Sequence, residues 1–338
     1  MALINRCWQL ARRPGGTVAP DDLVLVEETV RDLANGEVLI RNLYLSLDPT
    51  NRLWMSEREQ YMPPVVLGDV MRGGTIGVVE QTRSDKLAVG DIVMSARGGW
   101  QLYTIDNAMW CRRLPQSDSI PLTAYMSVLG GTGITAYFGL MDICRPVAGE
   151  TLVVSAAAGA VGSVVGQIAK IHGAKVVGIA GGEAKCAWLR ELGFDAAIDY
   201  KAGPIDTALD AALPDGADML FENVGGTIMD AAFRRLNLGG RMALCGMISN
   251  YNDEGPMAGP RDFGRILMNR LTVRGFIVLD YLPRAAEAMT AISGWIAEGR
   301  LRWKDHVVDG LEEAPTALQR LFTGNHDGKL LVRVSELG

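Results

Sequence analysis

The chain has 338 residues, of which 48% are hydrophobic and 21% charged, and its formal net charge is −6. This length leaves room for two domains of ordinary size, each with its own core. The acidic balance gives no basic patch for nucleic acid and no polybasic patch for a membrane surface. The N-terminal stretch breaks its apolar residues with Asn5, Arg6 and Gln9, so it has no signal-peptide core and we expect a cytoplasmic protein.

The cysteines and histidines argue against both a disulfide framework and a metal site. The five cysteines are far apart and odd in number, which suits a reducing compartment. The three histidines, His172, His306 and His326, lie late in the chain, and no pair of these residue types has metal-ligand spacing. We therefore expect a metal-free protein.

The first 122 residues lack any regular alternation of strands and helices. Short strand-like runs separated by glycines predict a small β-barrel or curled sheet, with strands at 37–47, 74–80, 91–95 and 100–105. The connection at 48–64 carries aromatic residues and methionines. Long loops of this kind in compact domains are more often functional than idle.

From residue 126 the pattern changes to alternating strands and helices. Strands are expected at 151–155, 175–180, 196–199, 218–222, 241–245 and 271–278, with helices at 135–141, 184–192, 205–213, 230–236 and 283–298. This series predicts a doubly wound parallel sheet with helices on both faces. The helix at 312–322 and the strand at 329–334 cannot form a domain alone, so we expect them to return to the first one. The predicted domains are 1–125 with 301–338, and 126–300, with a cleft between them.

A glycine turn at 151–169, TLVVSAAAGAVGSVVGQIA, joins an expected strand to an expected helix. This context is typical of dinucleotide binding, although Ala157 stands where the first glycine of G-x-G-x-x-G belongs. Gly159 lets the backbone approach a pyrophosphate, Gly162 lets the helix pack closely, and the helix N-terminus favours anions. A transmembrane helix is an alternative, but the glycines and polar residues argue against it. Glycine packing in a nucleotide-free protein is the other alternative.

The end of the next strand indicates which nucleotide is bound. A carboxylate about twenty residues after the turn selects a cofactor without a 2′-phosphate, but here Gly181 and Gly182 end the strand. Lys185 follows within the next turn, and Glu183 lies beyond the strand, where it could cap the helix. Taken alone, Lys185 is better explained as a solvated helix lysine. Together, the glycines and the lysine favour NADP(H).

Several segments resemble one family: LSLDPTNR, AAAGAVGSVVGQIAK, FENVGG, CGMISNYN, RGFIV and GKLLVRV. The chain resembles zinc-independent members of the medium-chain dehydrogenase/reductase superfamily. It is most similar to the group of leukotriene B4 12-hydroxydehydrogenase and 15-oxo-prostaglandin 13-reductase, which includes NADPH-dependent alkenal and enone double-bond reductases. The resemblance covers nearly the whole chain. It implies a Rossmann domain, a GroES-like β-barrel substrate domain and a homodimer.

The resemblance also implies which residues contact the cofactor. Lys185 and Tyr200 would hold the 2′-phosphate, and 245–251 and 276–278 would line the nicotinamide. Either Asn325 or His326 could reach the nicotinamide, or neither. The full set of expected cofactor contacts is Thr135, Ala158, Gly159, Ala160, Val161, Gly181, Lys185, Tyr200, Asn223, Cys245, Gly246, Ile248, Ser249, Phe276, Ile277, Val278, Asn325 and His326.

On the substrate side the chain departs from the group. Residues 48–52 read Asp-Pro-Thr-Asn-Arg, where the group usually has Asp-Pro-Tyr-Met-Arg, in a loop that faces the substrate. We therefore expect Asn51 and Tyr61 to face the substrate, whose identity stays open. Tyr251 resembles the tyrosine assigned in the group as hydrogen-bond donor or proton source. The cofactor's ribose hydroxyl is a second candidate donor, and Tyr251 could also be a simple loop aromatic.

The implied reaction is NADPH-dependent reduction of the carbon–carbon double bond of an α,β-unsaturated ketone or aldehyde. Hydride goes to the β-carbon, and the carbonyl oxygen needs hydrogen-bond donors because no zinc is expected. An NADPH quinone reductase and a non-catalytic NADPH-binding protein are the alternatives. An alcohol dehydrogenase is disfavoured by the missing metal ligands.

Overall fold

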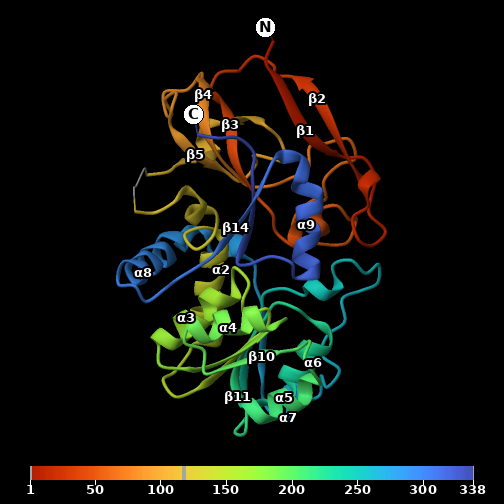
Figure 1. The fold of residues 1–338 in the computed structure, drawn as a ribbon, viewed down its shortest axis with the longest axis vertical. Helices are drawn as coiled ribbons and strands as arrows, with labels where there is room; N and C mark the ends of the chain where they lie inside the picture. Colours follow the sequence, from red (N-terminus) through yellow and green to blue (C-terminus); the bar gives the residue numbers. More distant parts are fainter. Residues whose placement is uncertain (1, 116–118, 338) are drawn as a thin grey trace.

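The computed structural model of the chain describes residues 2–115 and 119–337, which fold around two large β-sheets. The red, orange and dark blue segments of Figure 1 build the upper sheet, and mainly green segments build the lower half. Both marked termini lie at the upper end, because the C-terminal segment returns to the N-terminal domain (Figure 1). This arrangement is a GroES-like barrel domain on a Rossmann domain, as the sequence predicts.

The barrel domain holds a seven-stranded mixed sheet in the order β14-β15-β3-β4-β5-β7, with β6 on β3. Its strands are β3 (Glu37–Ser46), β4 (Thr75–Thr82), β5 (Ile92–Ser95), β6 (Tyr103–Asn107), β7 (Cys111–Arg113), β14 (Asp305–Asp309) and β15 (Lys329–Arg333). A separate antiparallel pair comprises β1 (Ile4–Leu10) and β2 (Leu23–Thr29). The expected return of the C-terminal strand is confirmed, since β15 pairs with β3.

The Rossmann domain holds a six-stranded parallel sheet in the order β10-β9-β8-β11-β12-β13. The strand order reverses between β8 and β11, and ligands bind at the carboxyl ends of the strands at such a switch point. The strands are β8 (Thr151–Val154), β9 (Lys175–Ala180), β10 (Ala196–Asp199), β11 (Ala217–Glu222), β12 (Leu236–Leu244) and β13 (Thr272–Gly275).

Two cores cover the two faces of this sheet. Leu152 and Val154 of β8 belong to one core, whereas Val153 between them belongs to the other, as the alternation along a strand requires. On the face of the first core lie α2 (Gly131–Phe138), α3 (Gly162–Ile171), α4 (Glu183–Glu191) and α8 (Ala285–Ala297). The second core is covered by α5 (Ile205–Ala212) and α6 (Gly226–Phe233). The predicted doubly wound sheet is therefore confirmed.

Some predicted bounds are wrong. The helix expected at 230–236 begins at Gly226, because Gly225 and Gly226 take positive φ angles and form the turn that starts it. Leu236 belongs to β12 instead. This strand contains two adjacent glycines, at 239 and 240, a pattern that in a sequence usually indicates a turn. The helix expected at 135–141 begins at Gly131 and continues as a π-helical turn, Gly139–Cys144. No helix in the described residues is long and apolar enough to cross a membrane, and 151–169 forms β8 and α3.

The two domains are joined through several direct contacts. Gly159 of the glycine turn forms an isolated parallel bridge with Gly328, just before β15. The segment that leaves α8 is held by Gln167 of α3, whose side chain both donates to and accepts from the backbone of Arg302, at 2.8 Å each. The remaining helices are α1 (Thr50–Trp54), α7 (Arg265–Met268) and α9 (Ala314–Thr323). The expected boundary near 300 lies between α8 and β14, and that near 125 lies in a short 3-10 helix, Leu122–Met126; both stay a prediction.

Candidate functional site

The glycine turn that follows β8 brings the backbone close to the start of α3. Ala156 takes a left-handed φ of 47°, and the N–H of Gly159 donates to its carbonyl at 2.9 Å. A Cβ on Gly162 would lie 2.5 Å from the same carbonyl oxygen, so only glycine fits there. The turn lies at the switch point, where the positive end of the α3 dipole favours a pyrophosphate.

The corner expected to hold a 2′-phosphate contains three groups. Lys185, near the start of α4, donates from Nζ to the carbonyl of Gly324 at 2.7 Å, and burial lowers its pKa. Tyr200 lies over Gly181, since a Cβ at that position would be 2.8 Å from the tyrosine ring. Lys201 lies there too, with Nζ 5.9 Å from the centre of that ring. The sequence interpretation missed Lys201, although its position next to Tyr200 was a usable signal.

Asn223 follows β11 and is fixed against β8. Its N–H donates to Oγ of Ser155 at 2.8 Å, and its Nδ2 donates to the carbonyl of the same residue at 2.7 Å. These bonds tie the two strands of the switch point together at their carboxyl ends. Asn223 therefore lies beside the glycine turn, and its expected contact with the cofactor stays a prediction.

The segment 245–251 is built on the turn that follows β11. The N–H groups of Cys245 and Gly246 donate to the carbonyl of Glu222 at 2.9 and 3.1 Å, and that of Ser249 donates to Val224 at 2.9 Å. Burial raises the pKa of the Cys245 thiol to about 12. This thiol is therefore protonated at neutral pH, and a protonated thiol is a poor nucleophile.

Tyr251 is buried at the end of this segment, with 8% of its surface exposed. Its hydroxyl oxygen accepts a hydrogen bond from the N–H of Met247 at 3.2 Å and lies against Gly246. Burial raises the pKa of Tyr251 to about 12, so the hydroxyl keeps its proton at neutral pH. The residue can thus donate a hydrogen bond to an oxygen placed beside it.

The two expected substrate residues differ in their surroundings. Asn51 is fully buried, with Oδ1 accepting from the N–H of Asp48 at 2.7 Å and Nδ2 donating to the carbonyl of Arg72 at 3.1 Å. This geometry favours a role in holding the loop over contact with substrate. Tyr61 is 39% exposed and lines a pocket of about 350 Å³. Tyr61 is the better placed of the two for substrate contact.

Asn325 and His326, three and two residues before Gly328, also differ in their surroundings. The ring of His326 is half-buried, with Nδ1 3.0 Å from the carbonyl of Arg320, and burial lowers its pKa to about 4. The imidazole is therefore neutral at pH 7, and Nδ1 is the donor in this bond. Asn325 is exposed, and its N–H donates to the same carbonyl. Whether either side chain reaches the nicotinamide stays a prediction.

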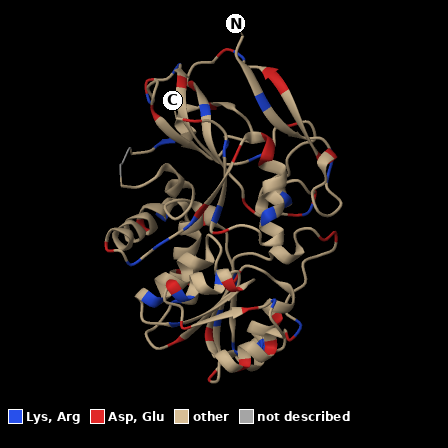
Figure 2. Cartoon of the chain, viewed as in Figure 1, with Lys and Arg blue, Asp and Glu red and all other residues tan. Residues whose placement is uncertain are grey.

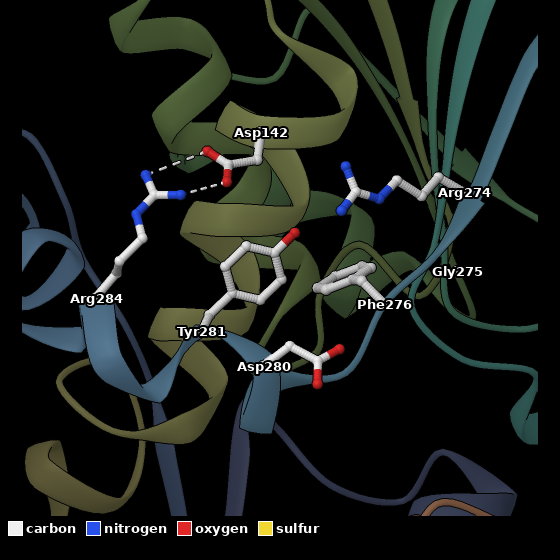
Figure 3. A pocket seen from close by; sticks show the side chains of 7 residues that line it. All are labelled: Asp142, Arg274, Gly275, Phe276, Asp280, Tyr281 and Arg284. Atoms are coloured by element: carbon white, nitrogen blue, oxygen red, sulfur yellow. Dashed lines mark hydrogen bonds and ion pairs between the residues drawn. The ribbon is translucent and has the colours of Figure 1, made fainter.

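Phe276 lies beside a second pocket, of about 290 Å³, at the outer edge of the parallel sheet. Its ring packs edge-on against Phe221 and Tyr281, as Figure 3 shows for Tyr281. An ion pair between Asp142 and Arg284, 2.6 Å long, closes one side of this pocket. The Phe276 side chain thus belongs to a packed cluster, and the expected cofactor contacts of residues 276–278 stay a prediction.

Thr135 donates from its hydroxyl to the carbonyl of Gly131 at 2.7 Å within α2. The remaining expected contacts, Ala158, Ala160, Val161 and Ile248, lie in the glycine turn and in the segment 245–251. In residues 2–115 and 119–337 no group of three or more His, Cys, Asp or Glu side chains could hold a metal ion.

A parallel sheet with a glycine turn at its switch point, packed against a barrel, defines a two-domain dehydrogenase or reductase. Two family models match the chain: an N-terminal domain of oxidoreductase at residues 6–114, and a zinc-binding dehydrogenase at residues 160–294. The chain belongs to the medium-chain dehydrogenase/reductase superfamily, in the zinc-independent group that contains prostaglandin reductase 1.

The relatives match over both domains. The NADPH-dependent curcumin reductase of Escherichia coli (strain K12) is 41% identical over 340 residues, which cover 98% of this chain and 97% of that protein. Prostaglandin reductase 1 of Rattus norvegicus is 37% identical over 97% of this chain and 98% of its own length. The crystal structure of CurA in complex with NADPH from Vibrio vulnificus matches with a TM-score of 0.92 and 41% identity, covering 98% of this chain and 99% of that chain.

Proposed function

We propose that this protein uses NADPH to reduce the carbon–carbon double bond of α,β-unsaturated ketones or aldehydes. The names of full-length relatives support the cofactor and the reductase activity, since one is an NADPH-dependent curcumin reductase and another a prostaglandin reductase. The observation that carries the proposal is a buried, protonated Tyr251 in the segment that follows the switch point.

The residues of the site divide into three groups by what they would hold. Lys185, Tyr200 and Lys201 meet a 2′-phosphate, and the glycine turn meets the pyrophosphate through backbone and helix dipole. Asn223 and the segment 245–251 lie toward the nicotinamide. Tyr61 lies on the substrate side, and Asn51 holds its loop. These roles are supported by the positions of the side chains and by the resemblance.

The chemistry follows from where charge develops. When bound, NADPH supplies a hydride, that is, one proton with two electrons, to the β-carbon of the substrate. The π electrons of the double bond then move toward the carbonyl oxygen, which becomes an enolate oxygen. Tyr251 donates a hydrogen bond to that oxygen, and a proton from solvent then adds to the α-carbon. Such a fixed donor typically contributes about 10²–10³ in turnover.

Product analysis with deuterated NADPH tests the reaction. The expected product is a saturated carbonyl compound with deuterium on the β-carbon and a solvent proton on the α-carbon. An allylic alcohol as the main product would contradict the proposal, because it means that the carbonyl was reduced. Turnover of quinones without turnover of enones would favour a quinone reductase, and binding of NADPH without any turnover a non-catalytic role.

We also propose a homodimer that forms through β13, one of the two edge strands of the parallel sheet. All four residues of β13 are exposed, and the following turn exposes Leu279 and Leu282, 44% and 51%. An unpaired edge strand with apolar neighbours is a natural site for pairing with a second chain. Analytical ultracentrifugation tests this, and a Val273→Pro variant, which cannot extend the sheet, should be monomeric. A monomeric wild type would contradict it.

We propose the cytoplasm as the location and a small molecule as the only partner besides a second copy. All five cysteines are free thiols, which fits a reducing compartment. Lys and Arg are interspersed with Asp and Glu over the elements drawn in Figure 2, so this view shows no basic face for nucleic acid.

A further inference from the structure

Glu222, the last residue of β11, is a buried carboxyl group with an unsatisfied oxygen. The residue has no exposed surface. Its Oε1 accepts hydrogen bonds from the N–H groups of Val224 and Gly225, at 2.5 and 2.7 Å. Its Oε2 is buried and has no partner among the described residues. An ionised carboxylate in such a place is costly unless a positive charge compensates it.

The position of Glu222 relates it to the cofactor site. It stands at the carboxyl end of β11 next to β8, and a dinucleotide binds at this switch point. Its carbonyl accepts from the N–H of Gly246, and the Tyr251 hydroxyl lies against that same glycine. The backbone of Glu222 is thus hydrogen-bonded directly to the segment 245–251, which carries the proposed oxyanion donor.

Few charged groups face this carboxyl. From the end of β12 the Cys245 thiol faces it, and this thiol is neutral at physiological pH. From the end of β8 comes the Ser155 hydroxyl, and from the turn before α6 come backbone N–H groups. None of the described lysine, arginine or histidine side chains pairs with it. Burial raises the pKa of Glu222 to about 7, so both of its charge states are populated near neutral pH.

We propose that Glu222 senses the redox state of the cofactor: its carboxylate favours the cationic nicotinamide ring of NADP⁺ over the neutral ring of NADPH. This inference rests on the proposed function, because it needs NADP(H) at the switch point. A positive charge at the switch point would compensate the buried Oε2, which accepts no hydrogen bond of normal geometry among the described residues. The same charge stabilises the positive charge that grows as hydride leaves, which assists reduction of the substrate.

The affinities of the two cofactor forms, measured without substrate, test this inference. Both forms carry the same phosphates, so the ratio Kd(NADP⁺)/Kd(NADPH) isolates the effect of the ring charge. Ionisation of Glu222 strengthens NADP⁺ binding, so the ratio should fall as pH rises from 5.5 to 8.5, with a midpoint near 7. A difference of about one pKa unit between the two complexes corresponds to about a tenfold fall.

Glu222→Gln keeps the shape and an oxygen for both N–H donors but removes the charge, so its ratio should not depend on pH. Glu298→Gln, at the exposed end of α8, is the matched control and should behave as wild type. A second measurement needs no variant: wild type should release more protons on binding NADP⁺ than on binding NADPH, as calorimetry in two buffers of different ionisation enthalpy reports.

The outcomes separate this inference from the proposed function. If wild type binds neither cofactor, the proposed function itself fails. If it binds both with a ratio independent of pH, and with equal proton release, only the role of Glu222 is overturned. The role is also overturned if Glu222→Gln folds and keeps the pH dependence of wild type. If that variant does not fold, the proton release of wild type alone decides.

Discussion

The Nζ of Lys185 donates a hydrogen bond to the carbonyl oxygen of Gly324 at 2.7 Å, and this bond connects the start of α4 with the end of α9. The lysine of the Rossmann domain therefore reaches the barrel domain directly. Its charge lies at the carboxyl end of a helix, where the helix dipole favours a cation. One side chain thus links the proposed phosphate corner to the packing of the two domains.

Replacing Lys185 with alanine should weaken NADPH selectively. A hydrogen bond to a charged group contributes about 1.5–3 kcal/mol, so the KM for NADPH should rise about tenfold or more while that for NADH changes little. Arg190→Ala removes an exposed cation from the same helix and serves as the control. Steady-state kinetics with both cofactors measures this. An equal rise in KM for NADPH and NADH would show that Lys185 does not bind the 2′-phosphate.

Tyr251→Phe should lower turnover while NADPH binding stays near normal. The variant keeps the ring in its buried site and removes only the hydroxyl, so a main oxyanion donor should cost about 10²–10³ in kcat. Because burial raises the pKa of Tyr251 to about 12, the hydroxyl stays protonated, and its contribution should not titrate between pH 7 and 10. A loss below about tenfold would assign the main role to the ribose hydroxyl.

Gly166→Ala should destabilise the Rossmann domain. A Cβ on Gly166 of α3 would lie 2.0 Å from the buried ring of Phe194. Overpacking of this kind typically costs about 1–3 kcal/mol. Gly294→Ala is the control, because it lies inside α8 with no atom within 4 Å of the new Cβ. Alanine there should stabilise the helix by about 0.8–1 kcal/mol. Urea unfolding measures both, and equal changes would contradict the packing argument.

The stability of the protein should depend on Asp48, the acidic partner in an ion pair with Lys329. Lys329 is 3% exposed, and its Nζ donates to the carboxylate at 2.8 Å and to the carbonyl of Leu47 at 2.6 Å. Asp48→Asn leaves a buried ammonium without a counter-ion, which typically costs about 3–5 kcal/mol. Lys329→Met should cost less, because Asp48 is a third exposed and water can solvate it. Thermal unfolding of the two variants decides the order.

Chelation should leave the enzyme active. No zinc ligand set is visible in the sequence, and the proposed mechanism takes its electrophilic assistance from a tyrosine. Purified protein should contain no stoichiometric zinc by elemental analysis, and its turnover should be the same before and after treatment with EDTA. Stoichiometric zinc together with loss of activity on its removal would contradict this prediction.

Much of the Rossmann domain could be predicted because its strands and helices are coded locally. The apolar run at 151–154 and the helical spacing in 162–171 each identify their element without knowledge of the rest. The strands β1, β2, β7 and β14 were not predicted, because their mixed polar and apolar residues give no regular local pattern and depend on pairing with other strands. β14 pairs with β15, and β1 touches the barrel through an isolated bridge between Cys7 and Gln101.

The residues of the site also divide into those that local sequence patterns predict and those that depend on the folded chain. The glycine turn and Lys185 follow from patterns in neighbouring residues, and the family resemblance adds Tyr200, Asn223 and Tyr251. Lys201 was missed although it is adjacent to Tyr200 in the chain, whereas the role of Glu222 could not be recognised in this way. Whether Glu222 lacks a counter-ion depends on side chains from β8 and β12, which only the folded chain brings together.

The placement of β15 in the barrel sheet has a consequence for how the protein is made. Its residue Lys329 bonds to Leu47, 282 positions earlier in the chain, and the edge of β3 at Tyr44–Ser46 pairs with β15. At about 5–20 residues per second, this edge waits roughly 15–55 s for its partner to leave the ribosome. The parallel sheet, whose strands all lie between 151 and 275, is complete well before then. The domain that is translated first is therefore the one that closes last.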